Sequence, residues 1–124
     1  MLAAVNAQRS ANGAPPLTLC GTLMRAAQAH SEDQAAHQSM THIGSDGSSM
    51  TDRAVRAGYA GWNRLAENVA AGYPDIPSVM AGWMGSTGHR ANLLEPASTH
   101  LGVGQAVSGS TIYWTQDFGA GGAC

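Results

Sequence analysis

Residues 83–94, with the sequence WMGSTGHRANLL, form the stretch around which the rest of the chain is organised. The stretch joins a helix that carries Trp83 to a second, short helical turn. A hydroxyl, a glycine and His89 lie between the two helical segments. Polar, titratable groups at such a junction are held by the scaffold but remain open to water, which is typical of functional sites. We therefore expect Glu67 and His42 upstream, and a hairpin downstream, to converge on His89.

The segments on either side of this stretch show helical periodicity or the alternation of strands. Turn residues separate them, chiefly Gly, Pro, Ser and Asp. The expected helices cover residues 2–11 and 21–39, a short segment capped by Ser49 or Thr51, and a segment that starts at residues 75–78; the expected strands cover residues 65–72, 101–107 and 112–118. Helices around a small antiparallel sheet give an α+β fold, a three-layer α/β/α sandwich that residues 1–124 form as a single domain.

Two features predict how these elements pack. Trp83 is expected in the hydrophobic core, because a large aromatic side chain on an apolar helix face is most simply buried. The last two strands form a hairpin around Ser108-Gly109-Ser110. Gly102 and Gly104 leave one face of its first strand bare, which suits the close approach of another layer.

The composition excludes several classes of function. The chain has 124 residues, of which 44% are hydrophobic and only 11% charged, and its net charge is −2. All six basic residues are Arg, and no basic run exists, so a nucleic-acid partner is not expected. No apolar run approaches the roughly 18 residues of a membrane span. No signal peptide is visible in this chain, although one removed before Met1 would leave no trace.

Cys20 and Cys124 are the only cysteines. In a small domain rich in Gly, Ser and Thr, they predict one disulfide that ties down the C-terminal segment; the alternative is two free thiols in a cytosolic protein. We favour the disulfide, because a Cys after Gly119-Ala120-Gly121-Gly122 has little other structural use. An oxidising compartment follows from that pairing.

His42, Glu67 and His89 are the residues that carry candidate chemistry. Two imidazoles and a carboxylate are a normal ligand set for zinc or another divalent cation, with an open position for water. Without a metal, Glu67 would hold one imidazole in a fixed tautomer while the other acts as an acid or base. A carboxylate within the apolar run of residues 65–72 needs a partner if it is buried; the alternative is a Glu on the solvent face of an edge strand.

Other polar residues have simpler interpretations. Ser86 with His89 and Glu67 supplies the parts of a hydroxyl-nucleophile site, but the Gly-x-Ser-x-Gly elbow is absent and capping of the next turn is favoured. His30 and His37, seven residues apart on one helix, are interpreted as histidines hydrogen-bonded in or near the core rather than as ligands.

Five motifs in order resemble the CAP superfamily of cysteine-rich secretory, antigen-five and pathogenesis-related class-one proteins, in its microbial branch. The motifs are Met40-Thr41-His42, Ala66-Glu67-Asn68-Val69-Ala70, Trp83-x-x-Ser86-x-Gly88-His89-Arg90-x-Asn92-Leu93-Leu94, Gly102-Val103-Gly104 and Tyr113-Trp114-Thr115-Gln116-Asp117-Phe118-Gly119. Essentially the whole chain is covered. The resemblance implies a secreted α/β/α sandwich, extracellular or associated with the cell wall, with a large central cleft.

In animal and plant members of that family, two His and two Glu in the cleft bind zinc. His42 and Glu67 match the first of each. The region that holds the second Glu in the family reads Met84-Gly85-Ser86 in this chain, and Tyr113 occupies the place of the second His. We expect His89, which is typical of the microbial branch, to fill the cleft in their place; with two or three protein ligands, weak or no zinc binding is expected.

Family members are linked to sterol or fatty-acid binding, defence, venom action, cell-wall association and, in isolated cases, proteolysis. We predict a non-enzymatic module whose cleft binds a small lipid, a peptide or a cell-wall component. The residues expected in that cleft are His42, Glu67, Asn68, Ser86, His89, Tyr113 and Gln116. The alternative is a secreted hydrolase that uses metal-activated water or His/Glu acid–base chemistry in the same cleft. A purely structural hydrogen-bond network around Glu67 and His89 is a further alternative.

Overall fold

A four-stranded sheet runs through the centre of the computed structural model, which describes all residues from 1 to 124. Its strand order is β1-β3-β4-β2. Three strands are antiparallel, as predicted: β2 (Arg64–Ala71), β3 (His100–Ser108) and β4 (Thr111–Ala120). The short strand β1 (Thr18–Leu19) pairs in parallel with β3, so the sheet as a whole is mixed.

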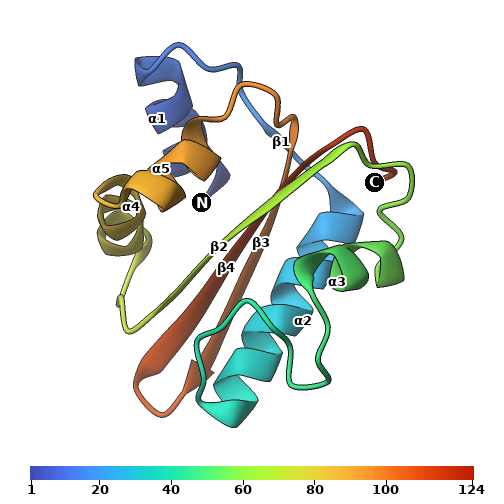
Figure 1. Cartoon of the computed structure of the whole chain (residues 1–124). Helices are drawn as coiled ribbons and strands as arrows, with labels where there is room; N and C mark the ends of the chain where they lie inside the picture. Colours follow the sequence, from blue (N-terminus) through green and yellow to red (C-terminus); the bar gives the residue numbers. More distant parts are fainter.

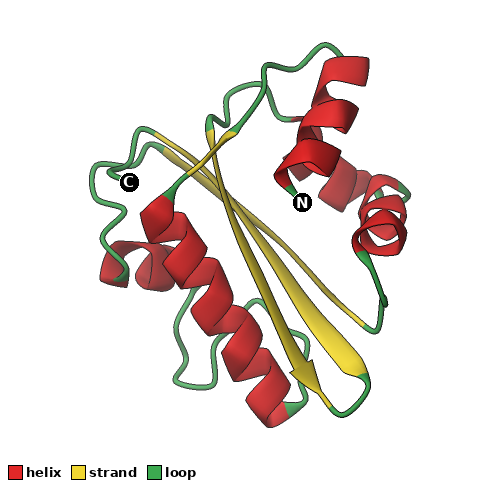
Figure 2. Cartoon of the chain, turned by 180° about the vertical axis from the view of Figure 1, so that it is seen from behind, coloured by secondary structure: helices red, strands yellow, loops and turns green.

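Helices cover both faces of the sheet, which confirms the three-layer α+β sandwich (Figures 1 and 2). One face carries α2 (Gly21–His37) and α3 (Met50–Arg56). The other face carries α1 (Leu2–Ala11), α4 (Ile76–Met84) and α5 (Thr87–Leu94). No helix combines the length and the hydrophobicity that crossing a membrane requires.

Local sequence signals set the ends of several helices. The Ser49 hydroxyl accepts a hydrogen bond from the Asp52 N–H, and the Asp52 carboxylate accepts one from the Ser49 N–H, which together form a capping box at α3. The Asp75 side chain caps α4 by accepting a hydrogen bond from the Ser78 N–H. Helix α2 stops at His37, two residues earlier than predicted, because Gln38 adopts the left-handed conformation with φ of 50°.

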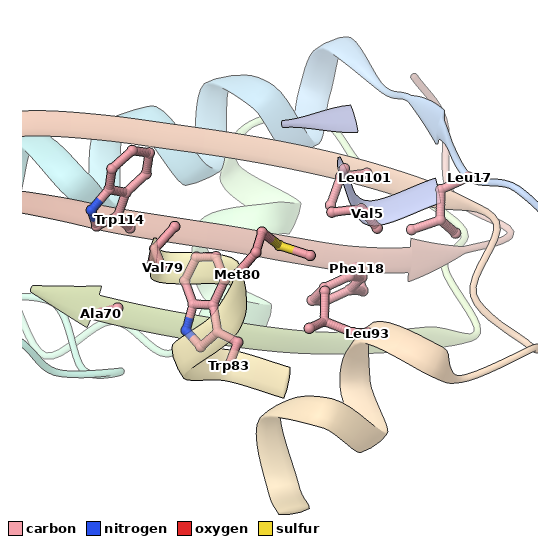
Figure 3. Packing of buried hydrophobic residues seen from close by; sticks show 10 residues of the cluster. All are labelled: Val5, Leu17, Ala70, Val79, Met80, Trp83, Leu93, Leu101, Trp114 and Phe118. Atoms are coloured by element: carbon pink, nitrogen blue, oxygen red, sulfur yellow. The ribbon is translucent and has the colours of Figure 1, made fainter. Parts of the chain in front are cut away.

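The larger hydrophobic core lies between the sheet and the layer of α1, α4 and α5 (Figure 3). Trp83 of α4 is 2% exposed there, as predicted, and its Nε1–H donates a 3.2 Å hydrogen bond to the Val69 carbonyl of β2. The buried members of this core are Val5, Leu17, Ala70, Val79, Met80, Trp83, Leu93, Leu101, Trp114 and Phe118.

On the opposite face, α2 lies directly against the backbone of β3. A Cβ atom at Gly102 would overlap the Leu23 carbonyl of α2, and one at Gly104 would overlap the Ala27 carbonyl. The predicted close approach at these two glycines is therefore confirmed.

Cys20, just before α2, is joined to Cys124 by a disulfide, as predicted. The sequence separation of 104 residues means that this bond links the C-terminal segment to the start of the central helix.

Candidate functional site

Glu67 is the centre of the candidate site. Strand β2 places its side chain, which is 3% exposed, on the face of the sheet that α2 and α3 cover. One carboxylate oxygen, Oε1, accepts a 3.0 Å hydrogen bond from His42 Nδ1, and Oε2 accepts a 2.8 Å hydrogen bond from Arg53 Nη1. The prediction that this carboxylate is buried and partnered is confirmed, and the solvent-facing alternative is wrong.

Arg53 of α3 is the partner that sequence reasoning missed. Its side chain is 7% exposed and holds Glu67 in a two-pronged ion pair, since Nη2 lies 3.2 Å from Oε1. Nη2 also donates a 2.5 Å hydrogen bond to the His42 carbonyl. One guanidinium therefore fixes both the carboxylate and the backbone of the loop that carries His42.

Asp117 is a second missed residue. It lies opposite Glu67 in the β2–β4 register, is fully buried, and neither of its oxygens accepts a hydrogen bond. Burial and the neighbouring Glu67 carboxylate raise the pKa of Asp117 well above its ordinary value, which favours the protonated form of this side chain. Burial alone would raise the pKa of Glu67 as well, but the neighbouring Asp117, Arg53 and His42 side chains outweigh burial and lower it.

His30 of α2 borders the same cluster. Its Nε2 donates a 2.6 Å hydrogen bond to the Thr41 carbonyl and lies 3.9 Å from Glu67 Oε1. Burial lowers the pKa of this imidazole, which therefore remains neutral at neutral pH. The interpretation of His30 as a hydrogen-bonded histidine near the core is confirmed, whereas His37 lies exposed with Nδ1 2.9 Å from the Asp33 carbonyl.

His89 reaches the site from the other side of the edge strand β2. It lies on α5, is half-buried, and its pKa is lowered by burial and by the charge that His42 carries when protonated. The two imidazoles are therefore close enough to influence one another, although no hydrogen bond joins His89 to Glu67. Ser86 is the N-cap residue of α5, and its hydroxyl bonds neither to that helix nor to His89.

The sheet divides the remaining residues of the predicted cleft. Tyr113 lies on the same face as Glu67, because alternate residues of β4 face alternate sides. Asn68 and Gln116 face α4 and α5 instead, where Asn68 Nδ2 donates to Gln116 Oε1 at 3.2 Å and to the His89 carbonyl at 3.2 Å. The structure thus brings His42 and Glu67 into contact, and it places His89 on α5 with the two amides, across the edge strand from Glu67.

A cavity of about 300 Å³ opens where β2, α4 and α5 meet. Its apolar wall includes Met40, Val69, Ala70 and Trp83, and Ser86 and His89 supply the polar side. A larger cavity of about 510 Å³ lies between α2, α3 and the loop before α3. Its wall is mainly charged or polar, and charges on it pair with one another, as Arg56 and Asp46 do at 3.0 Å.

The residues present do not fit a three-ligand metal site of His42, Glu67 and His89. Both Glu67 oxygens are engaged by Arg53 and His42, and only the second nitrogen of His42 is free for a metal. The single set of three metal-ligating atoms within 4.8 Å of one another involves Cys20, His100 and Cys124, two of which form the disulfide. The expectation of weak or no zinc binding in the cleft stays a prediction.

Comparison with known proteins places this geometry in a family. Residues 2–118 match the model of the cysteine-rich secretory protein family, CAP. The chain is 40% identical over 113 residues to the uncharacterized protein YkwD of Bacillus subtilis, and the match covers 91% of the chain and 43% of that protein. It is 37% identical over 89 residues to the uncharacterized membrane protein YlbC of the same organism, with 72% and 24% covered. The chain spans less than half the length of either relative.

Solved structures give the same result. An extracellular protein of Bacillus anthracis that contains an SCP domain superposes with a TM-score of 0.84 at 32% identity, over 92% of this chain and 37% of that one. An outer surface protein of Borrelia burgdorferi shares the fold, with a TM-score of 0.87 at 18% identity over 95% and 87% of the two chains. The motifs, the sandwich and these matches agree, and the chain belongs to the cysteine-rich secretory protein (CAP) family.

Proposed function

We propose that this domain is a secreted binding module whose cleft at the edge of β2 takes a small lipid, a peptide or a wall-derived ligand through an apolar segment. The observation that carries the proposal is the cavity of about 300 Å³ beside His89, in which six of nine lining residues are hydrophobic. Ligand pockets typically combine such an apolar wall with a few fixed polar groups.

The polar groups at the cleft are suited to a neutral or weakly polar ligand group. The lowered pKa of His89 keeps its imidazole uncharged near neutral pH, so the ring can both donate and accept a hydrogen bond. Glu67 accepts the Nδ1–H of His42, which leaves Nε2 of that half-exposed ring as an acceptor. The Arg53–Glu67 pair holds His42 in this orientation, and we assign the pair a positioning role.

Secretion is supported by two observations. The solved relatives include an extracellular protein of Bacillus anthracis and an outer surface protein of Borrelia burgdorferi. The Cys20–Cys124 disulfide is of the kind that persists in oxidising compartments.

Binding of two probes tests the proposal. The probes are a fluorescent polyene fatty acid and a purified muropeptide, titrated separately against the wild type and against Ser86→Phe. Because the Ser86 side chain makes no hydrogen bond and lines the cavity, Phe fills the cavity without removing a structural contact. We expect the wild type to bind one probe and Ser86→Phe to lose at least about tenfold in affinity, or about 1.4 kcal/mol.

The matched histidine variants are His89→Ala and His37→Ala. The first removes the imidazole from the polar wall of the cavity, and the second removes an exposed histidine that does not line the cavity. If His89→Ala weakens binding of the probe and His37→Ala does not, the result supports binding in the cleft. Binding of neither probe, or equal binding by the wild type and Ser86→Phe, would overturn the proposal.

A further inference from the structure

We propose that Cys20, Cys124 and His100 form a binding site for Zn²⁺ or another thiophilic divalent metal when the disulfide is reduced. The site is separate from the cleft and does not depend on the function proposed there. One ring nitrogen of His100 and both sulfur atoms lie within 4.8 Å of one another. Two thiolates and an imidazole are ligands that zinc prefers, with a water as the fourth.

His100 is already held as a metal-binding histidine is usually held. It begins β3, and its Nδ1 lies 2.8 Å from the Tyr59 hydroxyl. The two rings meet edge to face, with centroids 5.8 Å apart and an interplanar angle of 83°. When the Tyr59 oxygen accepts the Nδ1–H, the lone pair of Nε2, which has no protein partner, is available to a metal.

The two cysteines stay close together without the bond between their sulfurs. The Cys20 N–H donates to the Leu101 carbonyl at 3.0 Å. Next to Cys124, the Ala123 N–H donates to the Ala60 carbonyl at 2.9 Å, and the Ala123 carbonyl accepts from the Thr22 hydroxyl at 2.7 Å. Because backbone contacts hold both sides, we expect the Cα–Cα separation, 4.9 Å in the disulfide-bonded protein, to change little on reduction.

The chemistry balances with a dithiol as reductant. The dithiol attacks the sulfur of Cys124, which is an exposed residue, gives two electrons and two protons to the protein disulfide, and is itself oxidised to a disulfide. Zn²⁺ then displaces the two thiol protons into water as two Zn–S bonds form. At about 2.3 Å each, tetrahedral Zn–S bonds place the sulfurs about 3.8 Å apart, which side-chain rotation can supply at this Cα separation.

The bound metal would close the same loop of 104 residues that the disulfide closes. Reduction alone should therefore lower the melting temperature, and the metal should recover part of the loss. A cleft site made of imidazoles and carboxylate would give no sulfur-to-metal signal, so the two sites can be distinguished.

Titration of the reduced chain with Cd²⁺ tests the proposal. The protein is reduced anaerobically with a phosphine, which adds no competing thiol, and the ultraviolet thiolate-to-Cd²⁺ charge-transfer band is followed together with the melting temperature in Zn²⁺. We expect a band that saturates at one Cd²⁺ per chain, a raised melting temperature in Zn²⁺, and neither effect in the oxidised protein.

His100→Ala and His37→Ala are the matched variants. Loss of a direct ligand should weaken binding at least about 100-fold, the upper end of the roughly 10–100-fold that loss of an outer-shell partner costs. His37→Ala should bind like the wild type, because His37 lies exposed near the end of α2. The proposal is overturned if the reduced wild type shows no one-to-one band, if His100→Ala binds equally tightly, or if the reduced chain unfolds and Zn²⁺ does not refold it.

Discussion

At the scale of single residues, the Arg53–Glu67 pair dominates the site. Both side chains are almost fully buried, at 7% and 3% exposed. Arg53→Met keeps most of the apolar stem but leaves the Glu67 carboxylate buried without its cation, so we expect a loss of about 3–5 kcal/mol in the free energy of unfolding. Urea unfolding at pH 7 measures the loss.

Two variants test the cause of that loss. Arg90→Met changes an exposed arginine on α5 and should stay within about 0.5 kcal/mol of the wild type. The double variant Arg53→Met/Glu67→Gln should lose less free energy of unfolding than the two single variants lose together, because it has no unpaired buried charge. A loss below about 1 kcal/mol for Arg53→Met would show that the pair contributes little.

Asp117 gives the site a pH dependence of definite sign. Its raised pKa means that, above the ordinary Asp pKa of about 3.9, the native state binds more protons than the unfolded state, so this group lowers stability as the pH rises toward its folded pKa. Asp117→Asn keeps the size of the side chain but cannot ionise. We expect the stability of the variant, relative to the wild type, to rise from pH 4 to pH 7 by at most about 1.4 kcal/mol per pH unit.

Urea unfolding at several pH values measures this difference. Glu32→Gln, which changes an exposed carboxylate on α2, should follow the wild-type profile. A difference in stability between Asp117→Asn and the wild type that does not change with pH would contradict the raised pKa of Asp117.

At this scale the sequence predicted the need for a partner but not the partner itself. A carboxylate in an apolar strand requires a partner if it is buried, and that much follows from residues 65–72 alone. The choice of Arg53 depends on how α3 lies against β2, which no local pattern specifies. Asp117 was visible within a strand, but its pairing with Glu67 requires the register of β4 against β2.

At the scale of elements, the three long strands were predictable from the alternation of apolar and polar residues. Successive residues of a strand face opposite sides, so Glu67 and Asn68 cannot both line one face of β2. The sequence alone therefore predicts that the Glu67 and Asn68 side chains lie on opposite faces of the sheet. The sequence does not predict which element covers the free edge of β2. In the structure this element is α5, where Asn92 Nδ2 donates to the Glu67 carbonyl at 3.3 Å and to Asn68 Oδ1 at 2.9 Å.

The contact between α2 and β3 makes an element-scale prediction. Gly104→Ala would place a methyl group against the Ala27 backbone of α2, so the helix must shift away from the sheet. We expect a loss of about 3 kcal/mol, at the upper end of typical overpacking, measured by thermal and urea unfolding. The matched change Gly88→Ala has open space around the new methyl group and lies within α5, so it should be neutral or stabilise by up to about 1 kcal/mol. Similar losses for both variants would show that packing against α2 is not the cause.

At the scale of the whole molecule, the layer order and the disulfide were predictable because each has a signal spread along the chain. Helical and strand periodicities fixed the element types, and five ordered motifs fixed the family. The cleft was harder to predict, because it forms where β2, α4 and α5 meet and its shape depends on side chains from segments far apart in sequence.

The disulfide is the feature whose effect extends over the whole molecule. Closing a loop of 104 residues removes entropy from the unfolded chain, which in the chain-entropy account stabilises the native state by about 4–5 kcal/mol. The double variant Cys20→Ala/Cys124→Ala should lose about this amount of free energy of unfolding. Its urea m-value should rise, because the unfolded chain is free to expand. The α2 start should keep its backbone hydrogen bond to β3, so the native far-ultraviolet circular dichroism should be unchanged. A loss below about 1 kcal/mol with an unchanged m-value would mean that the unfolded chain stays compact without the bond.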